Sequence, residues 1–215
     1  MRVVLLGAPG AGKGTYAEEL KKHYHIPHIS SGDEFRAIKK QDSDLGRRII
    51  ELEKQGKLLD DATIMDVVAK RLSQPDCKNG YLLDGFPRTL YQAEHYDEVD
   101  SHEVDVVLYF NASEQTIVKR LMGRRVCDNP KCSTNYNIET NPPKKQGLCD
   151  ICGGHLSPRK DDNLEVIKKR LEVYHKETSP LVPYYEELGL LVEIDANRGI
   201  ADIVKDCIRR LDKYR

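Results

Sequence analysis

The sequence contains no tryptophan, only three phenylalanines and only three methionines among its 215 residues. It also has no apolar run that approaches the ~20 residues of a membrane-spanning helix. The 34 basic and 35 acidic residues leave a net charge of −1, so no global charge points to nucleic acid or membrane surfaces as partners. Met1 leads directly into an apolar segment with no signal-like stretch before it, and we therefore expect a cytoplasmic protein.

A chain of this length can bury one good hydrophobic core and carry a small inserted module. Its six cysteines do not predict a disulfide framework, because the cytoplasm is reducing. Cys77 and Cys207 stand alone in the sequence and are predicted to be small buried hydrophobic residues. The other four cysteines lie within one short region and need a separate explanation.

A glycine-rich segment, Gly7-Ala8-Pro9-Gly10-Ala11-Gly12-Lys13-Gly14-Thr15, follows the apolar residues 3–6 and opens a segment of helical spacing. Glycines between a buried strand and a helix let the backbone curl so that several N–H groups point toward a phosphate. Lys13 adds a charge that can reach the outer phosphates of a nucleotide. The spacing fits the P-loop pattern, except that Gly14 stands where that pattern has Ser or Thr, and the hydroxyl follows at Thr15.

Apolar runs alternate with segments of helical spacing along most of the chain. We expect strands at residues 3–6, 28–29, 81–84, 104–110 and 190–194. We expect helices at residues 16–25, at 34–56 with a break at 42–44, from Asp60-Asp61, from Thr89, at 113–124, from Asp162 with Glu165 as its capping partner, and at 200–211. This alternation predicts an α/β fold of three layers, in which helices cover both faces of a central parallel sheet.

Residues 126–158 differ in character, because Pro, Gly, Asn and Cys dominate and no helical period survives. Four residues separate Cys127 from Cys132, sixteen follow, and two separate Cys149 from Cys152. Two close pairs at this distance predict a tetrahedral four-thiolate site, normally for zinc, with iron as the less favoured metal. His155 offers an alternative ligand, although four thiolates already complete the shell. A structural metal would supply the order that so few apolar side chains cannot.

Three motifs occur in order, with the cysteines between the last two. They are the glycine-rich segment at 7–15, Asp84-Gly85-Phe86-Pro87-Arg88-Thr89, and Arg159-Lys160-Asp161-Asp162. In these motifs, and over essentially its whole length, the chain closely resembles adenylate kinases of the long form, whose lid carries a metal. The resemblance implies a P-loop core at residues 1–29, 60–123 and 161–215, a small helical AMP-binding segment at 30–59, and an inserted zinc-binding lid at 124–160.

The resemblance also implies reversible, Mg²⁺-dependent phosphoryl transfer from ATP to AMP, giving two ADP, by a monomer that serves adenine nucleotide homeostasis. ATP would be held by Gly10, Ala11, Gly12, Lys13, Gly14, Thr15, Arg120, Arg124, Asn135, Tyr136 and the backbone near Arg198. AMP would contact Ser31, Arg36, Lys57, Leu58, Leu59, Gly85, Phe86, Pro87, Arg88, Gln92, Arg159 and Arg170. The implied catalytic residues are Lys13, Arg88, Arg124, Arg159 and Arg170.

The chemistry of these side chains agrees with that reaction. Phosphoryl transfer needs two phosphates in line and positive charge around the transferring group, and planar guanidinium groups suit bidentate phosphate contacts. Asp84, at the tip of its predicted strand, is placed to hold Mg²⁺ through water, because Mg²⁺ keeps much of its hydration. The alternatives are solvated surface charges for the arginines and a helix-capping carboxylate for Asp84.

Three positions depart from the family pattern. Ser31 replaces the usual Thr but keeps the hydroxyl, and Asn137 replaces the usual His. The first cysteine pair has four intervening residues where two are usual, which leaves the identity of the metal open.

Three other functions compete with this interpretation. A kinase acting on UMP or CMP is disfavoured by Gln92 and the long lid, since pyrimidine kinases tend to have Asn at that position and a short lid. A P-loop GTPase would need Ser or Thr after Lys13 and an Asn-Lys-x-Asp motif, and the sequence has neither. A zinc-ribbon module that binds nucleic acid would use the basic residues around the cysteines, but Tyr136 is the only aromatic residue of that block.

Overall fold

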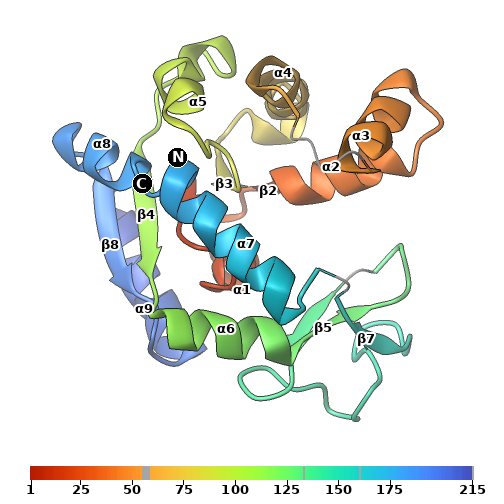
Figure 1. The fold of residues 1–215 in the computed structure, drawn as a ribbon. Helices are drawn as coiled ribbons and strands as arrows, with labels where there is room; N and C mark the ends of the chain where they lie inside the picture. Colours follow the sequence, from red (N-terminus) through yellow and green to blue (C-terminus); the bar gives the residue numbers. More distant parts are fainter. Residues whose placement is uncertain (55–58, 133, 160, 215) are drawn as a thin grey trace.

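A five-stranded sheet forms the centre of the molecule (Figure 1). The computed structural model describes residues 1–54, 59–132, 134–159 and 161–214. The sheet consists of β1 (Arg2–Leu6), β2 (His28–Ser30), β3 (Tyr81–Asp84), β4 (Val106–Asn111) and β8 (Leu191–Asp195). The strand order is β2-β3-β1-β4-β8, and all neighbouring strands run parallel. The predicted α/β fold with a central parallel sheet is confirmed.

Helices cover both faces of this sheet. One face carries α1 (Lys13–Tyr24) and α9 (Ile200–Leu211), and the other carries α4 (Asp61–Leu72), α5 (Leu90–Glu94) and α8 (Leu181–Glu187). Val3 and Leu5 of β1 lie in one buried cluster with Leu20 of α1. Val4, between them, faces the opposite core together with Val68 of α4. Because both faces are buried, the central strands have nearly continuous apolar sequences.

A second, small sheet lies in the region predicted to be the lid. β5 (Arg124–Cys127) is its middle strand, and β6 (Asn135–Asn137) and β7 (Leu156–Pro158) pair with it in antiparallel fashion on either side. These strands were not predicted, because three or four residues of mixed polarity are too few to show a period in the sequence.

The remaining helices surround the two sheets. α2 (Ser31–Lys39) and α3 (Asp44–Lys54) follow β2, and the break between them agrees with the predicted interruption. α6 (Glu114–Gly123) and α7 (Leu164–Val173) share a buried cluster. Short 3-10 segments lie at Pro75–Cys77, Tyr96–Glu98 and Asp212–Tyr214, and a π-helical turn at Tyr174–Thr178. Figure 1 shows α2 and α3 on the same side of the molecule as the small sheet.

Three helix starts differ from the prediction. α2 begins at Ser31, three residues before the predicted start, because the Ser30 side chain caps it by accepting from Asp33 N at 3.3 Å. α1 begins at Lys13, inside the glycine-rich segment, because Gly12 takes a φ of 100° and the chain turns into the helix directly after it. α7 is capped by Asn163, whose side chain accepts a hydrogen bond from Val166 N at 3.0 Å. The expectation that Asp162 caps this helix is therefore wrong, and Asp162 is instead buried against arginines.

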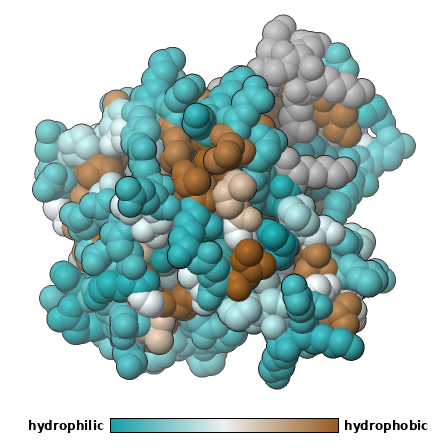
Figure 2. Space-filling model, turned by 60° about the horizontal axis from the view of Figure 1, so that its bottom comes forward, coloured by the Kyte–Doolittle hydropathy of each residue, from teal (hydrophilic) through white to brown (hydrophobic). Residues whose placement is uncertain are grey.

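Among the helices that the structure describes, none combines the length and the apolar character needed to cross a lipid bilayer. In the view of Figure 2, apolar residues form separate patches between hydrophilic ones. This pattern agrees with the charged fraction of 32% in the sequence.

Asp100 links the amino-terminal strand to the core beside β3. Its Oδ2 accepts hydrogen bonds from Arg2 Nε at 3.0 Å and from the Tyr81 hydroxyl at 2.7 Å. Its Oδ1 lies 2.9 Å from His102 Nδ1. Burial alone would raise the pKa of Asp100, but the Tyr81, His102 and Arg2 donors outweigh burial and lower this pKa to about 2.

We expect Asp100→Asn to lower the free energy of unfolding by about 1–3 kcal/mol at neutral pH, because charge-assisted hydrogen bonds are lost. A carboxylate whose pKa is depressed in the folded chain stabilises the fold above its ordinary pKa of 3.8, and this contribution is lost as the pH falls toward 2. Urea unfolding at pH 7, 5 and 3 should show the difference from wild type shrinking at the acid end. Asp97→Asn, an exposed control nearby, should change stability by less than about 0.5 kcal/mol. A difference that stays constant with pH would contradict the assignment.

Candidate functional site

The glycine-rich segment leaves the carboxyl end of β1 and curls into the first turn of α1, which holds Lys13, Gly14 and Thr15. Gly7, Gly10 and Gly12 have φ values of 145°, 89° and 100°, a region that favours glycine. A Cβ at Gly7 would lie 2.8 Å from Phe110 O, and one at Gly10 would lie 2.7 Å from Leu121 Cγ. The loop therefore packs tightly against β4 and α6, and its shape requires glycine.

Lys13 folds back over this loop. Its Nζ donates hydrogen bonds to Gly7 O at 2.7 Å and to Ala8 O at 3.1 Å. Burial lowers the pKa of Lys13, while the Asp84 carboxylate acts in the opposite direction. Arg120 Nη1 donates to Ala11 O at 3.0 Å. Lys13 and Arg120, both predicted to bind ATP, thus place positive charge beside the loop at the N-terminus of α1, a position that favours a bound anion.

Asp84, at the carboxyl end of β3, lies in a row of charged groups that the sequence analysis missed. His28 Nε2 of β2 is 3.7 Å from Asp84 Oδ2, and His28 Nδ1 is 2.9 Å from Glu18 Oε1 of α1. Burial alone would lower the pKa of His28, but the Asp84 and Glu18 carboxylates outweigh it and raise this pKa to about 9. His28 and Lys13 in turn hold the pKa of Asp84 below its ordinary value, although burial opposes them. Asp84 is therefore an anion facing two cations.

The loop after β3 brings several predicted AMP residues together. Ser31 Oγ and Arg88 Nε both donate to Gly85 O, each at 2.7 Å. Arg88 Nη2 also lies 3.5 Å from Ser31 Oγ. Phe86 and Pro87 of the same loop are buried and joined by a cis peptide bond.

The other predicted AMP residues are more widely spread. Arg36 pairs with Asp33 on α2, and Leu59 is half-buried just before α4. Gln92 is buried in α5. Lys57 and Leu58 lie outside the described residues.

Three predicted catalytic arginines meet at two neighbouring aspartates. Asp162, whose side chain is 3% exposed, accepts hydrogen bonds from Arg124 Nε and Nη2, both at 2.6 Å, and from Arg170 Nη1 at 3.1 Å. Asp161 pairs with Arg159 at 2.6 Å and with Arg170 at 3.3 Å. These arginines come from β5, from the end of the predicted lid and from α7. The aspartates belong to a motif identified in the sequence, but their role as arginine partners was not foreseen.

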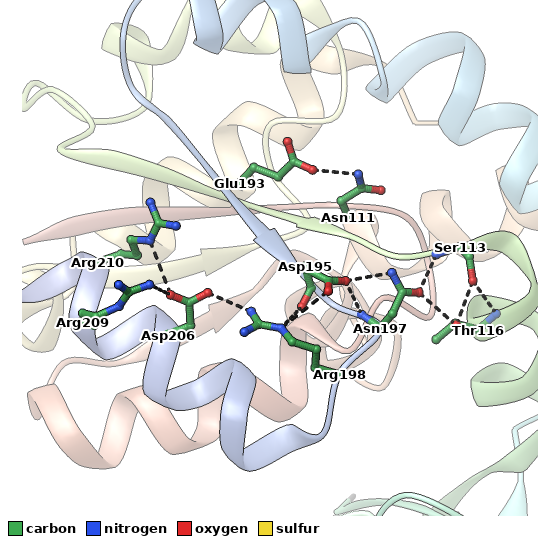
Figure 3. A network of polar contacts seen from close by, with 10 residues as sticks. All are labelled: Asn111, Ser113, Thr116, Glu193, Asp195, Asn197, Arg198, Asp206, Arg209 and Arg210. Carbon is green, nitrogen blue, oxygen red and sulfur yellow. Dashed lines mark hydrogen bonds and ion pairs between the residues drawn. The ribbon is translucent and has the colours of Figure 1, made fainter.

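The side chains of three other residues predicted to bind ATP lie in surroundings other than the glycine-rich segment. Asn135 is exposed on β6, and the buried Tyr136 hydroxyl lies 3.6 Å from Cys149 Sγ. The Arg198 guanidinium bridges Asp195 O at 3.0 Å and Asp206 Oδ2 at 2.8 Å (Figure 3). The sequence analysis expected only the backbone near Arg198 to contact ATP. That backbone lies just after the carboxyl end of β8.

Asn137, at one of the departures from the family pattern, ties the small sheet to α6. Its Nδ2 donates to Arg120 O at 2.9 Å, and its Oδ1 accepts from Glu139 N at 2.9 Å and Thr140 N at 3.0 Å. Ile138 N donates to Gly123 O at 3.0 Å. The base of the small sheet is therefore fastened to the last turn of α6.

The four predicted metal ligands form one cluster. The Sγ atoms of Cys127, Cys132, Cys149 and Cys152 all lie within 4.8 Å of one another. Cys127 and Cys152 are 3.4 Å apart and Cys132 and Cys149 are 3.6 Å apart, whereas tetrahedral Zn–S bonds of about 2.3 Å imply S···S distances of about 3.8 Å. A turn in which Cys132 N donates to Asn129 O at 2.9 Å closes the wider first pair. The donor set and its spacing fit a structural four-thiolate metal.

We expect Asp162→Asn to lower the free energy of unfolding by about 2–3 kcal/mol, because Arg124 and Arg170 lose their shared buried acceptor. Asp161→Asn is the matched control, since the Asp161 side chain is 39% exposed, and it should cost less than about 1 kcal/mol. Thermal and urea unfolding of the two variants measure this difference. Equal losses of stability would contradict the special role of Asp162.

Comparison with known proteins agrees with this geometry. A family model described as adenylate kinase matches residues 5–190. The chain is 47% identical to an adenylate kinase of Caldicellulosiruptor bescii, over 98% of this chain and 99% of the relative. It is 46% identical to one of Acetivibrio thermocellus, over 98% of each chain, and 42% identical to one of Staphylococcus aureus, over 99% of each. The chain therefore belongs to the adenylate kinase family of phosphoryl-transferring enzymes.

Proposed function

We propose that the chain transfers a phosphoryl group reversibly from ATP to AMP, giving two ADP. One observation carries the proposal: two loops with phosphate-binding chemistry leave adjacent parallel strands side by side. Leu5 of β1 pairs with Asp84 of β3, so the glycine-rich segment and the loop at residues 85–88 start at the same edge of the sheet. The first loop would hold the donor's phosphates and the second the acceptor's.

Positive charge would complete this site. Lys13 and Arg88 belong to the two loops, and we infer that Arg124, Arg159 and Arg170 exchange Asp161 and Asp162 for nucleotide phosphates. Guanidinium groups bind carboxylate and phosphate through the same forked geometry, so the exchange keeps their hydrogen bonds satisfied. In-line alignment and charge neutralisation would then be sufficient, because the acceptor is already an anion and needs no general base.

Mg²⁺ is the cofactor we infer for the nucleotide. The ionised Asp84 carboxylate is a suitable acceptor for the water ligands of Mg²⁺. A Cβ at Gly14 would come within 3.7 Å of Asp84 Oδ2, so glycine at this position leaves space beside the carboxylate for a hydrated ion. When bound, Mg²⁺ would neutralise charge on the phosphates.

We further propose three functional parts: a core at residues 1–29, 60–123 and 161–215, an AMP-binding segment at 30–59 and a lid at 124–160. The lid would close over ATP and exclude water, because an open site would hydrolyse ATP. Adenine nucleotide homeostasis in the cytoplasm, by a monomeric enzyme, is the physiological role that this reaction supports. Zinc would hold the lid together through its four cysteines and take no part in the chemistry.

Acceptor choice tests the proposed reaction. With MgATP as donor, we expect kcat/KM for AMP to exceed that for UMP and CMP by at least about 100-fold, because a site built around one base leaves polar groups unpaired with another. Lys13→Met should lower kcat by about 100-fold or more, since it removes a charge from the transferring phosphates. Lys22→Met, on the exposed side of α1, is the matched control and should leave kcat unchanged. Preference for UMP or CMP, or hydrolysis of ATP without an acceptor, would refute the proposal.

Metal content tests the role of the cysteines. We expect one zinc per chain by elemental analysis, lost in the double variant Cys149→Ser/Cys152→Ser but retained in Cys77→Ser/Cys207→Ser. The first variant should melt about 5–10 °C lower, because metal binding contributes folding free energy. Its turnover at low temperature should stay within a few-fold of wild type. Unchanged melting combined with abolished turnover would show that the metal serves chemistry and not structure.

A further inference from the structure

Gln92 of α5 is held at both ends of its carboxamide. Its Oε1 accepts a hydrogen bond from Arg88 N at 2.7 Å, and its Nε2 donates to Asp61 Oδ1 of α4 at 2.6 Å. Thr89 caps α5 by accepting from Gln92 N at 3.2 Å, and the Thr89 hydroxyl lies 3.5 Å from the same Asp61 oxygen. Gln92 as a whole is 1% exposed, so water does not replace either partner.

The two partners fix which way the carboxamide faces. A backbone N–H can only donate, so Arg88 N must meet the oxygen of the amide. An ionised carboxylate can only accept, so Asp61 must meet the NH₂ group. Rotating the amide by half a turn would place N–H against N–H and oxygen against carboxylate, with two buried polar groups left unpaired. One lone pair on Oε1 and one N–H on Nε2 remain, each in a fixed position.

Asp61 can accept the hydrogen bond from Gln92 because its neighbour, Asp60, caps α4. The Asp60 side chain accepts from Thr63 N at 2.9 Å and is the N-cap of α4. Asp61 follows as the first helical residue and reaches across to α5. The sequence suggested the pair Asp60-Asp61 only as a helix start. In the structure, Asp60 caps α4 and Asp61 contacts Thr89 and Gln92 at the start of α5.

Purines differ in polarity along the edge that an amide can bind. A 6-aminopurine offers an acceptor at N1 and a donor at its amino group, whereas a 6-oxopurine offers a donor at N1 and an acceptor at O6. An amide free to rotate can match either pattern, but an amide locked in one orientation matches only one. We propose that Asp61 is a positioning residue that makes the acceptor site select 6-aminopurine over 6-oxopurine monophosphates by locking Gln92. The inference rests on the proposed function, in which Gln92 contacts the base of AMP.

The test compares AMP with IMP, which differ at the 6-position and N1 alone. In Asp61→Asn the new amide can donate or accept, so a rotated Gln92 loses only its hydrogen bond with Arg88 N and becomes more accessible at nearly constant volume. We expect the AMP:IMP ratio of kcat/KM to fall at least about tenfold, equivalent to about one hydrogen bond. The change should lie in KM, with kcat at saturating AMP within about threefold of wild type. Asp66→Asn makes the same charge change at an exposed site on the same helix and should leave the ratio within twofold.

The outcomes separate this inference from the proposed function. A wild-type protein that does not phosphorylate AMP refutes the proposed function itself. An active wild type with an unchanged AMP:IMP ratio in Asp61→Asn refutes only the lock, and so does a parallel loss of kcat for both nucleotides. If Asp61→Asn does not fold, Asp61→Ser carries the same prediction, because a hydroxyl also serves as donor or acceptor.

Discussion

The pairing of β1 with β3 is the constraint on which the candidate site depends. Leu5 pairs with Asp84 on one side of β3, and Ser30 pairs with Asp84 on the other, so three loops start from one line across the sheet edge. These loops carry the glycine-rich segment, the hydroxyl of Ser31 and the guanidinium of Arg88. A register slip of one residue would point the Asp84 side chain toward the buried core and the Leu83 side chain toward the loops. An unpaired Asp84 carboxylate in an apolar core would be costly, so the core disfavours that slip and thereby sets the geometry of the polar site.

The cations of the site that the structure describes are paired with acceptors of the chain itself. Lys13 lies on backbone carbonyls of its own loop, Arg88 lies on Gly85 O, and Arg124 lies on Asp162. In the proposed function, binding of phosphate would exchange one acceptor for another and would not desolvate a bare charge, which would keep the energetic cost of assembling the site low. The same arrangement limits repulsion between arginines that converge from distant parts of the chain.

Features that depend on residue type and close spacing could be predicted from the sequence. The glycine conformations at 7, 10 and 12, the alternation of strands and helices, and the cysteine cluster all belong to this group. Features that depend on which segments become neighbours could not. His28 and Glu18 meet Asp84 only because β2 lies beside β3, and strand order leaves no mark on a single sequence. Asp162 resembled a helix cap because its true partner, Arg124, is far away in the sequence.

The small sheet connects the cysteine cluster to the arginines. β5 starts at Arg124 and ends at Cys127, while β7 ends at Pro158, directly before Arg159. The region has few apolar side chains, and Tyr136 and Leu156 are the large ones that pack with the cysteines among the residues described there. Because β5 and β7 have so few apolar contacts, they need other interactions to fix each of their ends. The thiolates and their metal would provide one anchor, and the aspartates at 161 and 162 provide the other. Loss of order at the cysteine end on heating would therefore also displace Arg124 and Arg159, which is why metal loss is expected to lower melting more than low-temperature turnover.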